Sequence, residues 1–369
     1  MRIGIPRETK PGECRVAVTP SGVRVLRDSG AGIVLETGAG AASGFGDREY
    51  RDAGGTIVPT AAEAWSSDLV VKVKEPLSPE FRFLSKSSTL FTFLHLAAVP
   101  QLAEELLTRR VTAIAYETVV SGGALPILRP MSEVAGILSI QVGARGLERG
   151  CGGRGVLLSG SGGSTPGDVA VLGAGVAGRN AARIAAGIGA NVTILDVNRE
   201  KLASANRECG GKTRTIPSTP EAIARVVKET DLLVSTVLLA GERAPRLVTR
   251  EMIRSMRPGA VVVDIAIDQG GSLETSRPTT HAEPYFIEEG VVHYCVTNMP
   301  AAVPRTSTQA LAAATLPYLL SISKRGVIGA LRSDEGLLAG LNTHDGHVTC
   351  AGVAKAFGKP FLPPGEAVG

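Results

Sequence analysis

Residues 168–178, DVAVLGAGVAG, are the most informative stretch of this chain. The apolar run that ends at Leu172 is typical of a strand buried on both faces of a parallel sheet. In the G-x-G-x-x-G pattern that follows, Gly173 allows a tight turn, Gly175 lets the backbone approach a pyrophosphate, and Gly178 lets the next helix lie close to the strand. The first turn of that helix offers N–H groups and a positive dipole to phosphates. The stretch predicts a dinucleotide-binding βαβ unit, with a purely structural glycine turn as the alternative.

The next apolar run ends at Asp196, 23 residues after Gly173. A carboxylate at this distance is expected to accept hydrogen bonds from the adenosine ribose hydroxyls. It would repel a 2′-phosphate, and no arginine follows it before Arg199. We therefore predict that the cofactor is NAD rather than NADP.

Short β-branched runs alternate with helix-patterned stretches on both sides of this motif, which is the rhythm of parallel α/β sheets. In the N-terminal half, the predicted strands are 1–5, 33–36, 69–72, 90–94 and 111–115, and the predicted helices are 20–29, 61–66 and 101–108. In the second series, the predicted strands are 169–172, 192–195, 232–236, 261–265 and 292–296, and the predicted helices are 176–188, 199–209, 221–228 and 249–256.

Two longer helices, predicted at 131–147 and 308–323, lead into and out of the second series. Too few residues follow the later helix to form a third domain, so we expect them to pack on the first. The sequence thus predicts an α/β fold with two doubly wound domains. A Rossmann NAD-binding domain, residues 129–306, is inserted in a discontinuous flavodoxin-like or Rossmann-like substrate domain, residues 1–128 and 307–369. Small ligands commonly bind in clefts between such domains.

The composition excludes several other classes of protein. A chain of 369 residues suggests about two domains, and 44% hydrophobic with 20% charged residues argues against disorder. The charge balance is 39 − 35 = +4 without a long basic run, and aromatic residues make up only 4%, so we expect no nucleic-acid partner. Residues after Pro360, with two further prolines, are predicted to form a frayed tail.

Targeting and metal signals are weak throughout. The N-terminus reaches a charge at once, no stretch of about 20 apolar residues is uninterrupted, and the five cysteines show no C-x-x-C spacing. We therefore expect a cytoplasmic protein with no signal peptide, membrane span or disulfide framework. His344 and His347 have H-x-x-H spacing but no acidic partner in a helical frame, so no metal site is predicted.

Four polar residues follow predicted strands or their loops, where ligands of open α/β sheets gather: Arg15, Lys74, His95 and Asp268. Each residue also has an ordinary structural alternative. The Arg and the Lys could be solvated surface charges, the His could be a core residue with its hydrogen bonds made inside the protein, and the Asp could form a turn. Two interpretations of Glu117 remain open: a carboxylate that supports reacting groups, or a core charge paired with a base. Taken singly, these residues do not decide between a site and those alternatives.

Long stretches together resemble the alanine dehydrogenases, within the alanine dehydrogenase and pyridine nucleotide transhydrogenase family. The matching segments are RIGIPRETKPGECRVAVTP (2–20), VKVKEPL (71–77), LFTFLHLA (90–97), AYETV (115–119), PMSEVAG (130–136), VLGAGVAGRNAARIA (171–185), VVVDIAIDQGG (261–271), SRPTTH (276–281) and VTNMPAAVPRTST (296–308). The resemblance implies NAD-dependent oxidative deamination of L-alanine to pyruvate and ammonia, and the reverse amination. It also implies the discontinuous two-domain layout and a homohexamer.

The resemblance assigns roles residue by residue. It implies that Arg15 and Lys74 bind the substrate carboxylate, and that His95 and Asp268 are catalytic. Together with the glycine motif, it implies cofactor contacts at Ser132, Gly173, Gly175, Gly178, Asp196, Lys201, Ser218, Val237, Leu238, Ile265, Asp268, Asn298 and Met299.

The residue types suit this chemistry. An Arg guanidinium can grip a carboxylate through two hydrogen bonds, a Lys ammonium adds a point charge, and an imidazole can transfer protons near neutral pH. Two rivals remain: the NAD-binding portion of a proton-translocating transhydrogenase, and a cyclodeaminase-type lyase. A small aliphatic pocket would discriminate weakly against glycine, 2-aminobutyrate, serine or glyoxylate.

Overall fold

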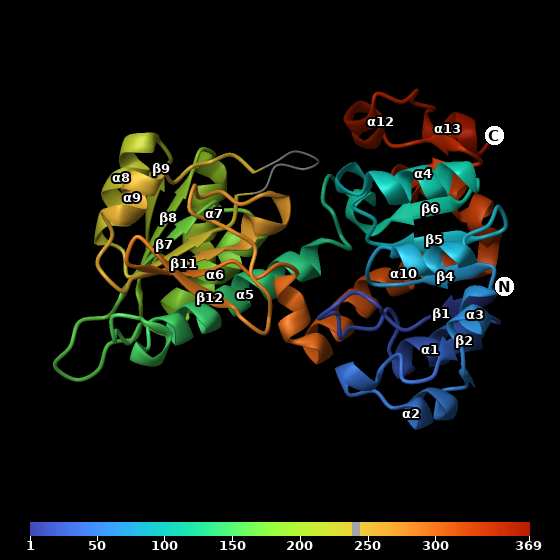
Figure 1. The fold of residues 1–369 in the computed structure, drawn as a ribbon, viewed down its shortest axis with the longest axis horizontal. Coiled ribbons are helices and arrows are strands. Elements are labelled where there is room, and N and C mark those ends of the chain that lie inside the picture. The colour runs from blue at the N-terminus through green and yellow to red at the C-terminus, as the bar shows by residue number, and fades with distance from the viewer. Residues whose placement is uncertain (238–243) are drawn as a thin grey trace. The chain divides into compact units, whose positions relative to one another are not determined.

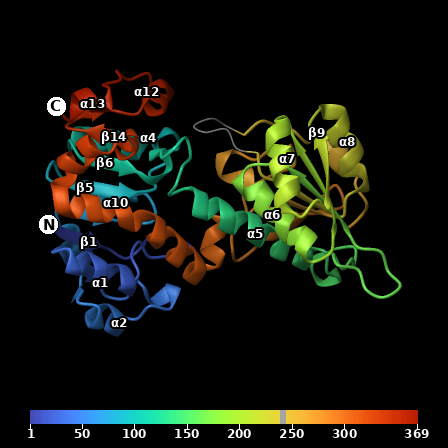
Figure 2. The ribbon, with the colours of Figure 1, turned by 180° about the vertical axis from the view of Figure 1, so that it is seen from behind.

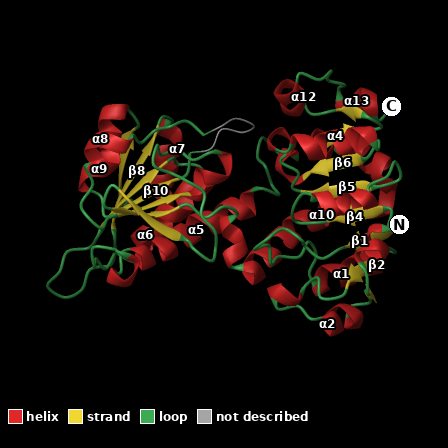
Figure 3. Ribbon diagram, in the orientation of Figure 1, coloured by secondary structure: helices red, strands yellow, loops and turns green. Residues whose placement is uncertain are grey.

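The computed structural model describes residues 1–237 and 244–369. The chain forms two compact units, each with its own sheet (Figure 1). Unit 1 comprises Met1–Met131 and Ala301–Gly369, and unit 2 comprises Ser132–Pro300. In each unit, helices cover the faces of the sheet (Figure 3). The predicted α/β fold is confirmed, including the interruption of the first unit by the second.

The sheet of unit 1 has the order β15-β14-β6-β5-β4-β1-β2-β3 within the described residues. Its strands are β1 (Arg2–Ile5), β2 (Gly32–Glu36), β3 (Thr56–Val58), β4 (Leu69–Val71), β5 (Thr89–Thr92), β6 (Thr112–Ala115), β14 (Leu341–His344) and β15 (His347–Val348). Strands β1 to β6 are parallel, whereas β14 runs antiparallel to β6. The order reverses between β1 and β4, as in Rossmann folds, and ligands of such sheets bind at the carboxyl ends of the strands beside this reversal.

The helices of unit 1 bury apolar side chains against both faces of this sheet. They are α1 (Pro20–Asp28), α2 (Asp47–Asp52), α3 (Ala61–Trp65), α4 (Pro100–Thr108), α10 (Pro304–Ser333), α11 (Glu335–Ala339), α12 (Ala351–Phe357) and α13 (Pro364–Ala367). Trp65 of α3 and Leu102 of α4 share one core cluster with Val70 and Leu90 of the strands. Helix α10 lies beside α1 and is seen best from behind (Figure 2).

The C-terminal part of unit 1 differs from the sequence-based expectations. Helix α10 is longer than predicted and contains a non-helical residue, Gly326, with φ 72°. The frayed tail was a wrong prediction, because Phe361 pairs with Val348 and the chain continues into α13. Val368 is buried, and its carbonyl accepts two hydrogen bonds from Arg332.

The sheet of unit 2 has the order β12-β13-β11-β10-β7-β8-β9, with β12 antiparallel and the others parallel. Its strands are β7 (Asp168–Leu172), β8 (Asn191–Asp196), β9 (Thr213–Pro217), β10 (Leu232–Ser235), β11 (Val261–Asp264), β12 (Tyr285–Glu288) and β13 (Val291–Tyr294). Its helices are α5 (Arg129–Gly146, mostly in this unit), α6 (Val176–Gly187), α7 (Arg199–Glu208), α8 (Pro220–Glu229) and α9 (Arg250–Arg254). The strand order reverses between β7 and β10.

Short 3-10 helices carry several loops at the strand ends. They are η1 (Ala41–Ser43), η2 (Ser78–Phe83), η3 (Leu96–Ala98), η4 (Tyr116–Thr118), η5 (Arg149–Cys151), η6 (Ile265–Gln269) and η7 (Met299–Ala302). Among the described residues, none of the helices combines the length and the apolar character needed to cross a membrane.

Candidate active site

The glycine motif turns the chain from β7 into α6, and the geometry explains two of its three glycines directly. Gly173 has φ 98°, a conformation that L side chains rarely adopt. A Cβ at Gly178 would lie 1.8 Å from the Gly173 carbonyl oxygen, so only glycine lets α6 pack this closely on the turn. A Cβ at Gly175, the N-cap of the 12-residue helix α6, would meet no atom of the described residues within 4 Å. Among those residues, the backbone at this N-cap is therefore open to a ligand, as a phosphate-binding turn requires.

Asp196 ends β8, and its carboxylate is bonded to the same turn. One oxygen accepts the Ala174 N–H (2.6 Å), and the other accepts the Asn198 N–H (2.8 Å) ahead of α7. A carboxylate has about four acceptor positions, so these two bonds leave capacity for ribose hydroxyls. Asp196 thus both shapes the glycine turn and presents a negative charge beside it.

Most of the other predicted cofactor residues lie at the carboxyl edge of the same sheet. Ser218 follows β9, Val237 follows β10, and Ile265 follows β11; all three are partly exposed. Leu238 lies outside the described residues. Ser132 is on α5 and Lys201 is exposed in the first turn of α7, so neither follows a strand.

Asp268 is exposed on η6, in the loop after β11. Its carboxylate accepts the Asn298 N–H at 3.0 Å, and Asn298 has φ 57°, which places it in the left-handed region. The buried Met299 follows at the start of η7. Two predicted residues that are 30 positions apart in the sequence are therefore in direct contact.

A buried carboxylate fixes the loop that carries Asp268. Asp264, at the end of β11, is 1% exposed. It accepts the N–H of Ala266 (3.0 Å), the N–H of Ser272 (2.8 Å) and the hydroxyl of Ser276 (2.7 Å). These bonds close the loop on itself and so limit where Asp268 can lie.

In unit 1, Lys74 follows β4 and is buried. The carboxylate of Glu8 accepts a hydrogen bond from the Lys74 N–H at 3.3 Å. The Lys74 carbonyl accepts a hydrogen bond from the Thr92 hydroxyl at 3.1 Å. The adjacent Glu75 is also buried. Burial would raise the pKa of Glu75, but the positive charge of Lys74 and a hydrogen bond from Lys10 outweigh it and hold the pKa below its usual value.

Arg15 is buried in the loop after β1 and already forms a bidentate ion pair within the chain. Its Nε donates to one oxygen of Glu13 at 2.7 Å, and its Nη2 donates to the other at 2.5 Å. Its Nη1 lies 3.0 Å from the sulfur of Met131. The loop is further anchored where the Val16 N–H donates to the Thr308 hydroxyl of α10 (3.1 Å). Arg15 is thus held in one orientation, and one edge of its guanidinium is hydrogen-bonded to Glu13.

His95 follows β5, and its side chain is 42% exposed, so it is not a satisfied core histidine. Its backbone is left-handed, with φ 48° and ψ 37°. Glu117, after the neighbouring strand β6, accepts the N–H of His95 at 2.6 Å and that of Leu94 at 3.2 Å. The same carboxylate lies 3.9 Å from the imidazole Nδ1. Glu117 therefore holds the main chain of His95 and faces its imidazole, which favours a carboxylate that supports reacting groups over a core charge.

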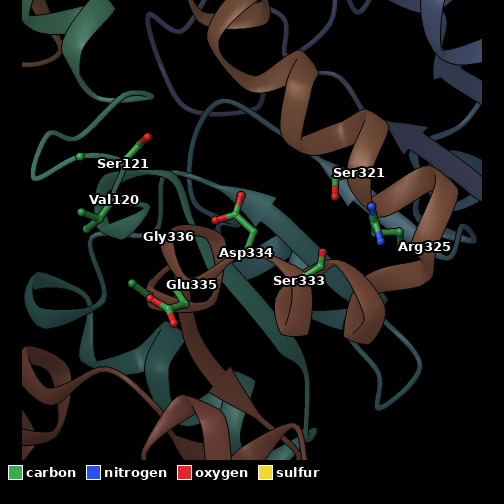
Figure 4. A pocket seen from close by; sticks show the side chains of 10 residues that line it. Val120, Ser121, Ser321, Arg325, Ser333, Asp334, Glu335 and Gly336 are labelled. Carbon is green, nitrogen blue, oxygen red and sulfur yellow. The ribbon is translucent and has the colours of Figure 1, made fainter.

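Sequence reasoning missed Glu8 and Glu13, although both stand in the loop after β1 where polar groups of such a sheet gather. A cavity of about 800 Å³ is lined by none of the predicted site residues; Val120, Arg325 and Asp334 are among its lining (Figure 4). His344 and His347 face each other across the β14–β15 hairpin, and His344 lies 3.0 Å from the Thr112 hydroxyl. Within the described ranges, no group of three or more His, Cys, Asp or Glu side chains is arranged to hold a metal ion.

Comparison with known proteins places the chain in a family. Residues 4–135 match the profile "Alanine dehydrogenase/PNT, N-terminal domain", and residues 139–351 match "Alanine dehydrogenase/PNT, C-terminal domain". The alanine dehydrogenase of Bacillus subtilis (strain 168) is 49% identical over 369 residues, covering 100% of this chain and 98% of that protein.

Solved structures give the same result. An L-alanine dehydrogenase superposes with a TM-score of 0.93 at 47% identity, covering 97% of this chain and 99% of the other. A transhydrogenase from Sinorhizobium meliloti superposes with a TM-score of 0.81 at 26% identity, covering 95% and 99%. The resemblance seen in the sequence is confirmed, and this chain belongs to the alanine dehydrogenase/PNT family.

Proposed function

We propose that this chain catalyses the reversible NAD-dependent oxidative deamination of L-alanine to pyruvate and ammonia. The observation that carries the proposal is the 49% identity with an alanine dehydrogenase over the whole chain. Membership of the family brings with it a nicotinamide dinucleotide cofactor. The polar residues at the carboxyl ends of both sheets support the same activity, because these are the ends at which such sheets bind ligands.

Unit 2 would hold the cofactor. The glycine turn at 173–178 and the N-terminus of α6 suit the pyrophosphate, since a Cβ at Gly175 meets nothing there. Asp196 suits the ribose hydroxyls and disfavours a 2′-phosphate, which supports NAD over NADP. When bound, the cofactor accepts a hydride from the substrate Cα; the chain's own residues supply binding, orientation and proton transfer.

Unit 1 would bind the amino or keto acid. In this proposal Arg15 and Lys74 bind the substrate carboxylate, and Glu13 keeps the guanidinium oriented. His95 transfers protons: one from the amine as the imine forms, and others as water adds to the imine carbon and ammonia leaves. Asp268 orients the attacking water or ammonia and stabilises the cationic imine by its charge.

Mixing the protein with L-alanine and NAD tests the proposal. We expect the absorbance of NADH to rise with NAD, and the absorbance of NADPH to rise far more slowly when NADP replaces NAD. A transhydrogenase activity, suggested by the relative that is 26% identical, would instead transfer hydride between two nicotinamide cofactors without an amino acid. A lyase that oxidises and re-reduces its substrate within one cycle would accumulate no NADH. Either outcome would replace the proposed reaction.

The family resemblance also supports a homohexamer. Light scattering should then give about six times the chain mass of 38.1 kDa. A monomeric mass at working concentration would remove this part of the proposal and leave the reaction untouched.

A further inference from the structure

In the part of the chain that the structure describes, the residues after β4 extend beyond the end of the neighbouring strand β1. Strands β1 and β4 pair in parallel, with Ile3 opposite Leu69 and Gly4 opposite Val70. Strand β1 ends at Ile5, and Pro6 follows. On the opposite side, the neighbouring strand continues, because the Phe93 N–H donates to the Val73 carbonyl at 3.3 Å. Within residues 1–237 and 244–369, the strand that pairs with the segment leading to Lys74 is therefore β5.

The side chain of Glu8 takes the place of the missing strand. One carboxylate oxygen accepts the Val73 N–H at 2.6 Å, and the other accepts the Lys74 N–H at 3.3 Å. From the β5 side, the Thr92 hydroxyl donates to the Lys74 carbonyl at 3.1 Å. Both the N–H and the carbonyl of Lys74 are thus fixed by side chains, which determines where its own side chain begins.

Glu8 is held in place by a buried ion pair. The ammonium of Lys72, which is 1% exposed, lies 3.3 Å from Glu8 and 2.9 Å from Glu80. Burial raises the pKa of Glu8, while Lys72 and the Val73 N–H act in the opposite direction. Burying a carboxylate is costly, so packing alone does not explain an acid at this position.

We propose that Glu8 is a positioning residue for substrate binding: it holds the main chain of Lys74 so that the ammonium meets the substrate carboxylate. The inference rests on the proposed function, in which Lys74 binds that carboxylate. It assigns Glu8 no contact with the substrate. Its effect should therefore appear in the KM of the amino and keto acids, with little change in kcat or in NADH affinity.

Glu8→Gln tests the inference, with Glu80→Gln as the matched control. Both variants remove a carboxylate from Lys72. Glu8 accepts the N–H groups of Val73 and Lys74, whereas Glu80 accepts the N–H of Leu77. We expect Glu8→Gln to raise the KM for L-alanine and pyruvate about tenfold, the loss of roughly one hydrogen bond to a charged group. The KM of Glu80→Gln should stay within about twofold of the parent.

Each outcome is decisive. Equal rises in KM for the two variants would trace the effect to Lys72 and overturn the inference, as would an unchanged KM in Glu8→Gln. If Glu8→Gln does not fold, Thr92→Val, which removes the hydroxyl from the Lys74 carbonyl at nearly constant volume, decides instead: a raised KM supports positioning through the Lys74 main chain, and an unchanged KM overturns it. If the parent enzyme itself forms no NADH from L-alanine, the proposed function fails first.

Discussion

His95 has a backbone conformation that costs a residue other than glycine about 1–3 kcal/mol. The carboxylate of Glu117 offsets this cost by accepting the N–H groups of Leu94 and His95, and it also faces the imidazole. The ring itself lies parallel to that of Phe93, with centroids 5.7 Å apart. Glu117 thus controls both the position of the imidazole and the charge beside it.

We therefore predict that Glu117→Gln lowers kcat by about tenfold, less than the 10²- to 10⁴-fold expected for His95→Ala. Glutamine keeps an oxygen for the backbone N–H but removes the negative charge that stabilises a protonated imidazole. Steady-state kinetics with L-alanine and NAD measures the effect. Glu105→Gln, which breaks a partly exposed pair between α4 and its C-cap residue Arg109, is the control and should leave kcat unchanged. A Glu117→Gln variant as active as this control would refute the role of Glu117.

Among the elements, α6 can lie this close to the turn before it because residue 178 is glycine. A Cβ at Gly178 would meet the Gly173 carbonyl oxygen at 1.8 Å and the Thr236 hydroxyl at 2.8 Å, so Gly178→Ala must push the helix away from the turn. We expect a loss of about 1–3 kcal/mol in unfolding free energy and a much weaker NADH affinity. Gly187→Ala is the matched control in the same helix, because a Cβ there meets nothing within 4 Å.

Thermal unfolding and NADH titration separate the two alanine variants. Gly187→Ala should bind NADH normally and gain up to about 1 kcal/mol, since alanine favours a helix over glycine. Equal NADH affinity in both variants would mean that the turn tolerates displacement of α6.

A residue in the turn between β12 and β13 makes the folding stability depend on pH. Glu289 accepts hydrogen bonds from Arg254 (2.9 Å) and Arg250 (2.7 Å) of α9, and these lower its pKa from 4.5 to about 2. Because the pKa is lowered in the folded protein, the contribution of Glu289 to folding stability is present above pH 4.5 and is lost as the pH falls toward 2. Glu289→Gln should therefore reduce stability near neutral pH, and its deficit should shrink at about pH 3. Denaturant unfolding at both pH values measures this, and a deficit independent of pH would contradict it.

At the scale of the whole molecule, the sequence predicted what depends on local pattern. The buried parallel strands were recognised from their continuous apolar runs. Strand β9 was missed because its residues are half-polar and partly exposed, and β12 because it is an antiparallel edge strand. The pairing of Arg15 with Glu13 and the support of Lys74 by Glu8 depend on loop conformation and on contacts between distant segments, which spacing alone does not specify. The left-handed backbone of His95 could not be predicted from the neighbouring residues in the sequence either.

The assignment of substrate residues to unit 1 and cofactor residues to unit 2 predicts two opposite phenotypes. Lys74→Met removes a charge from unit 1, so the KM for L-alanine and pyruvate should rise at least about tenfold while the Kd for NADH stays unchanged. Asp196→Ala acts in unit 2: it should weaken NAD binding and relax the discrimination against NADP, because the carboxylate that repels a 2′-phosphate is gone. Fluorescence titration of NADH and NADPH, beside steady-state kinetics, measures both. If Lys74→Met weakens NADH binding as strongly as Asp196→Ala does, the division of roles between the units is wrong, because neither residue could then be assigned to one ligand alone.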